Sequence, residues 1–304
     1  MRKNLLPYVL LLITSIIWGI VGPIIKNTLF YVEPVTLLFW RFVFTVAFVL
    51  PFFIFYLYKN PIKLSWIPKL IAIGVLGGVL PLILVFNGFK LTSSIEGTLI
   101  ASVSPLLVAI GAAFFLKEKL LKRELVGISL AIAGTVFVAI EPFFQSGLKG
   151  DDRVLGNILI LLYALSWASS VVLVKEWKGQ HIRPFHITST SFIVCLIAFT
   201  PLAFLEAGGF PRVDFSNFNI LGGLLYMSIL SSTVAYTLYY IALEKVHAAQ
   251  ADIFNYLQPV FAIPLSILWL NEKLTPFIIM GMLLIISGVG VAEYHARKRR
   301  AKVV

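Results

Sequence analysis

Charged side chains and cysteine are scarce in this 304-residue sequence. Charged residues make up 13% of it and hydrophobic residues 59%, whereas a soluble domain carries about 25% charged residues. No soluble fold buries that much apolar surface, so the composition indicates a membrane protein. The single cysteine, Cys195, excludes an internal disulfide and any cysteine-based metal cluster.

The motifs of common enzyme chemistries are absent as well. The sequence has no glycine-rich phosphate loop, no H-E-x-x-H pair and no nucleophile elbow. It also lacks the aspartate-rich pair that intramembrane prenyl-transfer enzymes need for magnesium. We therefore expect no catalytic residues, no cofactor and no metal. An enzyme acting on lipids stays an alternative from another class, as does a channel or scaffold without turnover.

The sequence does contain an internal duplication. Leu91–Ile140 matches Lys245–Tyr294 at an offset of 154, and the register continues upstream at an offset of 150. The matched positions include Pro105 and Pro259, Glu118 and Glu272, Gly134 and Gly288, Pro34 and Pro184, and Pro51 and Pro201. We predict one repeat over residues 1–150 and a second over residues 151–304. A duplication of this size in a membrane chain is typical of a transporter.

Apolar windows of spanning length, roughly 17–25 residues each, number five in each repeat. They are Leu5–Ile25, Pro34–Tyr58, Trp66–Phe89, Thr92–Leu116, Glu124–Ile140, Val154–Val174, Pro184–Leu205, Phe218–Leu243, Ala248–Leu270 and Pro276–Tyr294. The fold class expected is therefore all-α, a polytopic bundle of ten transmembrane helices. Gly22-Pro23 and Gly77-Gly78 predict unwound turns or kinks within two of them.

Basic residues set the expected orientation, because loops rich in Lys and Arg stay cytoplasmic. Most of the 25 Lys and Arg residues fall in loops on the side of the two termini, including the tail Arg297–Lys302. We expect a multi-pass protein of the cell membrane with both termini cytoplasmic. Five helices per repeat then make the second repeat thread the bilayer in the opposite sense. The net charge of +11 reflects this topology, and we expect contact with the lipid bilayer and none with nucleic acid.

Several motifs together resemble a known family. They are Ile17-Trp18-Gly19 followed by Lys26, then Arg41, and in each half a helix in which a proline is followed thirteen residues later by a glutamate. This pattern resembles the EamA family of the drug/metabolite transporter superfamily over the whole chain. The resemblance implies two inverted five-helix repeats and a central cavity between the first, third, fourth, sixth, eighth and ninth helices. It also implies export or exchange of small metabolites such as amino acids.

Polar faces that occur in one repeat only suggest a cavity for an asymmetric ligand. In the window Ala248–Leu270, Asp252, Asn255 and Tyr256 share one helix face, and the matched face near Ser102 is small. Tyr236 in the window Phe218–Leu243 is matched by Leu82. The predicted substrate-binding residues are Thr14, Trp18, Ser102, Trp167, Ser170, Ser232, Tyr236, Asn255 and Tyr256. The alternative is that these side chains join neighbouring helices.

Charges inside the spans are functional candidates by default. Asp252 and Glu96 are the carboxylates near the expected cavity, and we predict them as candidates for proton coupling. Arg41 lies about 10 Å below its helix end, shallow enough to reach the interface, so we expect a structural role and a pair with Glu96 or Glu33. A sugar-phosphate or nucleotide-sugar exchanger is the runner-up, and it would need cations in the cavity. For Glu118 and Glu272 we expect capping or loop contacts.

Stripes of small residues run along the last helix of each repeat. They contain Gly127, Ala131 and Gly134 in one, and Gly281 and Gly288 in the other. Small residues allow helices to approach closely. The stripes predict an interface either between the two repeats or between the subunits of a homodimer.

Overall fold

The computed structural model describes residues 5–115, 117, 122–146, 152–177, 183–246, 248, 251 and 253–300 of the chain. The described part is helical with short connections. Its first half contains α1 (Leu6–Thr28), α2 (Pro34–Lys59), η1 (Leu64–Trp66), α3 (Ile67–Gly74), η2 (Val75–Val79), α4 (Leu80–Leu91), α5 (Ser94–Ala101), α6 (Ser104–Phe115) and α7 (Lys122–Ser146). The second half contains α8 (Asp152–Glu176), α9 (Pro184–Glu206), α10 (Phe218–Leu225), η4 (Tyr226–Tyr236), α11 (Thr237–Lys245), η5 (Ile253–Leu257), α13 (Gln258–Leu270) and α14 (Pro276–Arg300).

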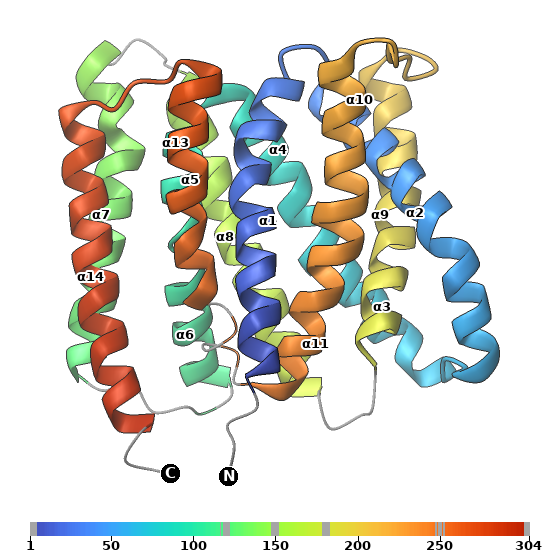
Figure 1. The fold of residues 1–304 in the computed structure, drawn as a ribbon, viewed down its shortest axis with the longest axis horizontal. Helices are drawn as coiled ribbons and strands as arrows, with labels where there is room; N and C mark the ends of the chain where they lie inside the picture. The colour runs from blue at the N-terminus through green and yellow to red at the C-terminus, as the bar shows by residue number, and fades with distance from the viewer. Residues whose placement is uncertain are drawn as a thin grey trace.

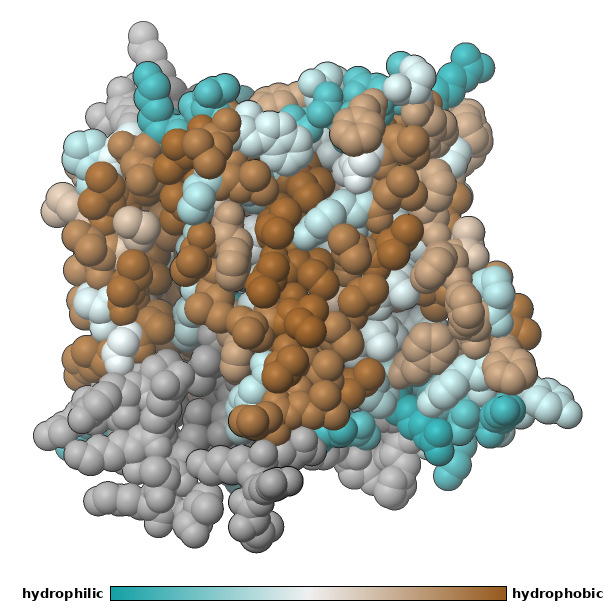
Figure 2. All heavy atoms as spheres, viewed as in Figure 1, coloured by the Kyte–Doolittle hydropathy of each residue, from teal (hydrophilic) through white to brown (hydrophobic). Residues whose placement is uncertain are grey.

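The helices form a membrane-spanning bundle. In the described residues eight segments are long and apolar enough to cross a bilayer, and the shorter apolar segments Phe254–Leu270 and Pro276–Val291 bring the set to ten. Figure 2 shows apolar side chains across the middle of the molecule, with hydrophilic ones along its upper edge and at the lower right. The all-α ten-helix bundle predicted from the sequence is confirmed.

The two halves run through the bundle in opposite senses. In Figure 1, α1 begins at the end where both termini lie, whereas α8 begins at the other end. We call these ends the terminal side and the far side. Helices α2 and α9 each begin with a proline, Pro34 and Pro184, whose fixed φ suits the first helical position. The matched start and the opposite direction are those of an inverted repeat.

The halves pack crosswise. Helix α1 lies against α13, α4 against α8, α2 against α9 and α7 against α14. A Cβ on Gly134 would meet the Gly281 carbonyl oxygen at 2.8 Å, and one on Gly288 would meet the Ala131 nitrogen at 2.4 Å. The small-residue stripes therefore contact each other within one chain, which is the first of the two interfaces expected for them. The homodimer stays a prediction.

Lys26 and Lys175 occupy matched positions in the two repeats and make equivalent hydrogen bonds. Lys26 at the end of α1 donates from Nζ to the carbonyl oxygens of Phe89 and Thr92, at 2.9 and 2.7 Å. Lys175 at the end of α8 donates to the carbonyl oxygens of Leu243 and Val246. Each lysine thus caps the C-terminal end of the same helix of its own repeat, where the helix dipole favours a positive charge.

The window Thr92–Leu116 was predicted as one helix, but the structure divides it into two. Helix α5 ends at Ala101 and α6 begins at Ser104, because Pro105 has no N–H to continue the helical ladder. In the second repeat a 3-10 turn, η5, precedes α13 and Pro259. The break at Gly77-Gly78 is a π-helical turn, η2, whereas α1 continues through Pro23.

Candidate functional site

A π-helical segment lies at the same place in each repeat. Segment η2 contains Gly77 and Gly78, and η4 contains Ser231 and Ser232 at the positions 154 residues later. Such segments widen the helix and occur often at functional sites. In η4 the Ser231 carbonyl oxygen accepts a hydrogen bond of 3.2 Å from the Trp18 indole. The widened turn of the second repeat thereby binds a side chain of the first.

A cavity lies between the two repeats beside η4. Its lining comes from α1, α2, α4, α5, α8, η4, η5 and α13: Trp18, Val21, Gly22, Ile25, Arg41, Leu82, Val85, Phe89, Thr98, Ala101, Tyr163, Trp167, Ser231, Tyr236, Asn255 and Gln258. The cavity volume is about 70 Å³. Water occupies about 30 Å³ per molecule and ligand pockets are typically ~300 Å³ or more. The cavity is therefore smaller in this conformation than a typical ligand pocket, and a solute would have to displace side chains.

Three aromatic rings meet on one side of the cavity. The ring centroids of Trp18 and Trp167 lie 5.5 Å apart, and Tyr236 lies 5.1 Å from the first and 5.8 Å from the second. All three pairs are edge-to-face, the arrangement favoured by aromatic quadrupoles. The sequence predicted Trp18, Trp167 and Tyr236 as substrate-binding residues on three separate helices, and the structure brings them together.

Arg41 lies in the cavity wall and not at the membrane interface. Its side chain is 2% exposed, and its guanidinium donates from Nε to Ser232 Oγ at 3.0 Å and from Nη2 to Ser231 Oγ at 3.4 Å. The expected pair with Glu96 or Glu33 was wrong. Helix α2 turns Arg41 inward against η4, so the side chain cannot reach the interface. Glu96 pairs with Arg153, and Glu33 with Lys90.

Amide and hydroxyl groups complete the polar part of the cavity wall. Asn255 is 5% exposed, and its Oδ1 accepts a hydrogen bond of 3.0 Å from Gln258 Nε2. Thr98 also faces the cavity, and its buried Oγ1 has no hydrogen-bond partner in the described part of the chain. An unsatisfied buried hydroxyl is costly, so Thr98 offers a hydrogen bond that a ligand can complete.

Five other predicted site residues do not line the cavity. The hydroxyls of Thr14, Ser102 and Ser170 bond to backbone carbonyl oxygens three or four residues earlier in the sequence, at 2.9, 2.6 and 2.7 Å. Thr14 also donates to the carbonyl oxygen of Ala235 in η4, at 3.4 Å. Ser232 accepts from Arg41, and Tyr256 packs against a separate apolar cluster that contains Val103 and Leu106. A substrate role for these positions stays a prediction, but in this conformation their side chains point elsewhere. The predicted list omitted six polar or aromatic residues of the lining: Arg41, Phe89, Thr98, Tyr163, Ser231 and Gln258.

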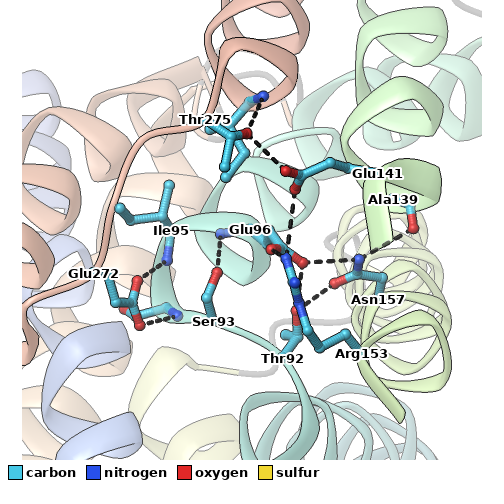
Figure 3. A network of polar contacts seen from close by, with 12 residues as sticks. Thr92, Ser93, Ile95, Glu96, Ala139, Glu141, Arg153, Asn157, Glu272 and Thr275 are labelled. Carbon is cyan, nitrogen blue, oxygen red and sulfur yellow. Dashed lines mark hydrogen bonds and ion pairs between the residues drawn. The ribbon is translucent and has the colours of Figure 1, made fainter. Parts of the chain in front are cut away.

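Of the two carboxylates predicted as candidates for proton coupling, the structure describes Glu96 alone. Asp252 lies outside the described residues. Glu96 is fully buried in a polar network on the far side (Figure 3), where it pairs with Arg153 and accepts from Thr92 at 2.9 Å and Asn157 at 3.1 Å. Arg153 also reaches Glu141, at 3.5 Å. Glu96 is absent from the cavity lining, so a coupling role would have to act through this network.

Glu272 joins the two repeats beside that network. Its carboxylate accepts hydrogen bonds from the backbone N–H groups of Ser94 at 2.7 Å and Ile95 at 2.9 Å, the first residues of α5 (Figure 3). Burial raises the pKa of Glu272 above its usual value of 4.5, although these two hydrogen bonds and the charge of Lys26 oppose the shift. The loop contact expected for Glu272 is confirmed, whereas Glu118 lies outside the described residues.

The bundle of inverted repeats around a central, mixed polar and aromatic cavity defines a multi-pass membrane transporter. The chain matches the EamA-like transporter family over two segments, residues 5–140 and 154–293, and it belongs to that family.

Two similar proteins are also called transporters. An uncharacterized transporter of Archaeoglobus fulgidus is 25% identical over 96% of this chain and 99% of its own length. The uncharacterized transporter YyaM of Bacillus subtilis is 27% identical over 96% of this chain and 94% of its own length. Protein PecM of Dickeya dadantii is 27% identical over 81% of this chain and 80% of its own length. A crystal structure with 19% identity superposes with a TM-score of 0.66 over 96% of this chain and 98% of the other, which shows the shared fold.

Proposed function

We propose that this transporter exports small organic metabolites by alternating access, with amino acids or similarly sized amphipathic solutes as the leading class. The cavity supports this proposal, because a cluster of three aromatic rings and several polar groups surround the same space. Aromatic rings bind the apolar part of a solute, and the polar groups orient its other end.

The proposal includes the cell membrane as the location and a cytoplasmic position for both termini. Helix α1 begins and α14 ends on one side of the bundle (Figure 1), and basic residues are frequent at the C-terminal end of the sequence. Loops rich in Lys and Arg stay in the cytoplasm. The far side, with Glu272 and the Glu96 network, would then face outward.

Binding of solutes to the purified protein tests the proposed function. A ligand that binds the folded state raises the midpoint of thermal unfolding, so a panel of amino acids, organic acids, nucleosides and sugars identifies candidates. Each candidate is then tested in proteoliposomes loaded with unlabelled solute, where labelled solute should enter by exchange. If no member of the panel binds or exchanges, the proposed class of solutes is wrong.

The runner-up, an exchanger of sugar phosphates or nucleotide sugars, gains one observation from the structure. It required a cation in the cavity, and Arg41 is there. A phosphate monoester carries nearly two negative charges at pH 7, however, and Arg41 is the one Lys or Arg among the described residues that line the cavity. The geometry therefore favours solutes with less charge.

A further inference from the structure

Arg41 is a buried cation without an acidic partner. It makes two hydrogen bonds, both to serine hydroxyls, and its guanidinium lies 5.6 Å from the ring centroids of Phe42 and Phe86. No ion pair joins it to a carboxylate of the described residues. A guanidinium has five N–H donors, so three of them have no protein acceptor among these residues. The positive charge of Arg41 is incompletely compensated.

A charge in this position is expensive to keep. Buried ions are normally paired, and an unpaired one inside a membrane span costs several kcal/mol. Arg153 shows the usual solution in this protein, because it is partly buried and pairs with Glu96 and Glu141. Arg41 differs in that it lines a cavity. The missing anion can therefore be a ligand.

Comparison of the repeats argues against a purely structural role. Lys26 and Lys175 cap equivalent helices in the two halves, as expected of cations that the fold requires. Between the matched pairs Pro34/Pro184 and Pro51/Pro201, Arg41 corresponds to Ser191. The serines that hold Arg41 correspond to Gly77 and Gly78. The second repeat makes the same helix contact without a cation or its hydroxyl partners.

We propose that Arg41 binds a single carboxylate of the transported solute, with the apolar body of that solute against Trp18, Trp167 and Tyr236. This inference rests on the proposed function and names its substrate class. One guanidinium balances one negative charge and can hold both carboxylate oxygens in a bidentate pair. A phosphate dianion would leave about one charge unbalanced in the cavity. The unpartnered Thr98 hydroxyl supplies a second polar contact in the same cavity.

The test varies the charge on the protein and on the ligand together. The ligands are matched pairs, leucine with leucinamide, phenylalanine with phenylalaninamide, and indole-3-acetate with indole-3-acetamide, and phenyl phosphate is a separate arm. The variants are Arg41→Met, Arg41→Lys and Lys90→Met. Lys90 is a matched control, because it lies in the same half of the chain outside the cavity, in a half-exposed ion pair with Glu33. Affinities are measured by calorimetry on detergent-solubilised protein.

Wild type should prefer the acid of at least one pair. Arg41→Met should weaken binding of that acid at least about 30-fold, since removing one partner of a buried charge pair costs upward of ~2 kcal/mol, and should change binding of the amide less than about threefold. Arg41→Lys keeps the charge and loses the planar fork, so an intermediate loss of ~10-fold is expected. Lys90→Met should bind both ligands as wild type does. If Arg41→Met does not fold, the acid-to-amide ratio must still fall in Arg41→Lys.

The outcomes separate this inference from the proposed function. If wild type binds amides as well as acids, or Arg41→Met weakens both alike, the carboxylate assignment is wrong while transport of small solutes still holds. Tighter binding of phenyl phosphate than of any carboxylate would likewise overturn it, in favour of the exchanger. If no ligand binds at all, the solute class of the proposed function fails together with this inference.

Discussion

Glu272 provides the sharpest test of how the two repeats are held together on the far side. The first four N–H groups of a helix have no partner within it. In α5, Glu272 of the other repeat accepts two of them, Ser93 Oγ accepts the N–H of Glu96, and the Ser93 carbonyl accepts that of Gly97. The substitution Glu272→Ala would leave two N–H groups without their acceptor.

The expected cost follows from these two contacts. An unsatisfied buried N–H costs about 1–3 kcal/mol, and the lower figure applies because Glu272 is half-buried and water can replace part of the contact. Two groups at about 1 kcal/mol give ~2 kcal/mol, a decrease of roughly 4–8 °C in the thermal midpoint for a chain of a few hundred residues. Lys273→Ala is the control, because Lys273 is the exposed neighbour in the same loop, and it should leave the midpoint unchanged.

The pH dependence of the same site has a definite sign. Because burial raises the pKa of Glu272, the folded state binds its proton more tightly than the unfolded state does. The stability that this group contributes is fully present below its usual value of 4.5 and is lost as the pH rises through the raised value. Glu272→Gln is neutral at every pH. The thermal midpoint of wild type minus that of Glu272→Gln, measured from pH 4 to pH 8 in detergent, should therefore decrease with rising pH. A difference that stays constant or increases would show that the two backbone hydrogen bonds outweigh burial, and would refute the reasoning.

Four further predictions address the cavity, the repeat interface, the orientation and the energy source. Tyr236→Ala and Asn255→Ala should reduce exchange of solute in proteoliposomes at equal protein abundance, because both side chains line the cavity; normal rates in both would place the binding site elsewhere. Gly288→Ala should lower the thermal midpoint by the equivalent of about 1–3 kcal/mol, because the new Cβ meets the backbone of α7, whereas Gly290→Ala on the same helix meets nothing within 4 Å and should not. In a variant without Cys195, a cysteine at Lys273 should react with an impermeant thiol reagent added to intact cells and one at Lys122 should not; the reverse pattern would invert the proposed orientation. Asp252→Asn or Glu96→Gln should abolish accumulation against a gradient and preserve exchange if that residue carries a coupling proton; uphill transport with wild-type pH dependence in both variants would exclude coupling through them.

The architecture was predictable because it rests on features that repeat along the chain. Apolar windows of spanning length and the matched prolines depend on the local sequence alone. The breaks were harder to predict. Pro105 indicated a helix with a weak point, but proline is tolerated within a membrane helix, as Pro23 is in α1, so the sequence did not show that α5 would end at Ala101. The sequence could also not show that the hydroxyls of Thr14 and Ser170 bond to their own helix backbone, because serine and threonine in membrane helices adopt this arrangement as readily as they line a cavity.

The error at Arg41 has a specific physical cause. The distance of Arg41 from the end of its helix indicated how far its side chain would have to extend to reach the membrane interface. That distance carries no information on which side of the helix the side chain points to. Helix α2 is apolar on nearly all sides, so hydrophobic periodicity cannot identify its inward face. The direction is set across the bundle, where the π-helical turn of η4 places Ser231 and Ser232 opposite α2. That contact joins residues about 190 positions apart.

The two repeats separate the groups that hold the fold from those that give the cavity its chemistry. Lys26 and Lys175 cap equivalent helices, and such duplicated residues are needed wherever the fold occurs twice. The cavity wall consists largely of positions that differ between the halves, such as Tyr236 against Leu82 and Ser231 against Gly77. An inverted repeat with identical halves would present the same groups on both sides of its axis. Such a cavity would suit a symmetric solute, whereas most metabolites are asymmetric. Because only one half contributes Arg41, the cavity wall contains one charged group together with the aromatic rings of Trp18, Trp167 and Tyr236. A cavity of this kind can orient a solute that is polar at one end and apolar at the other.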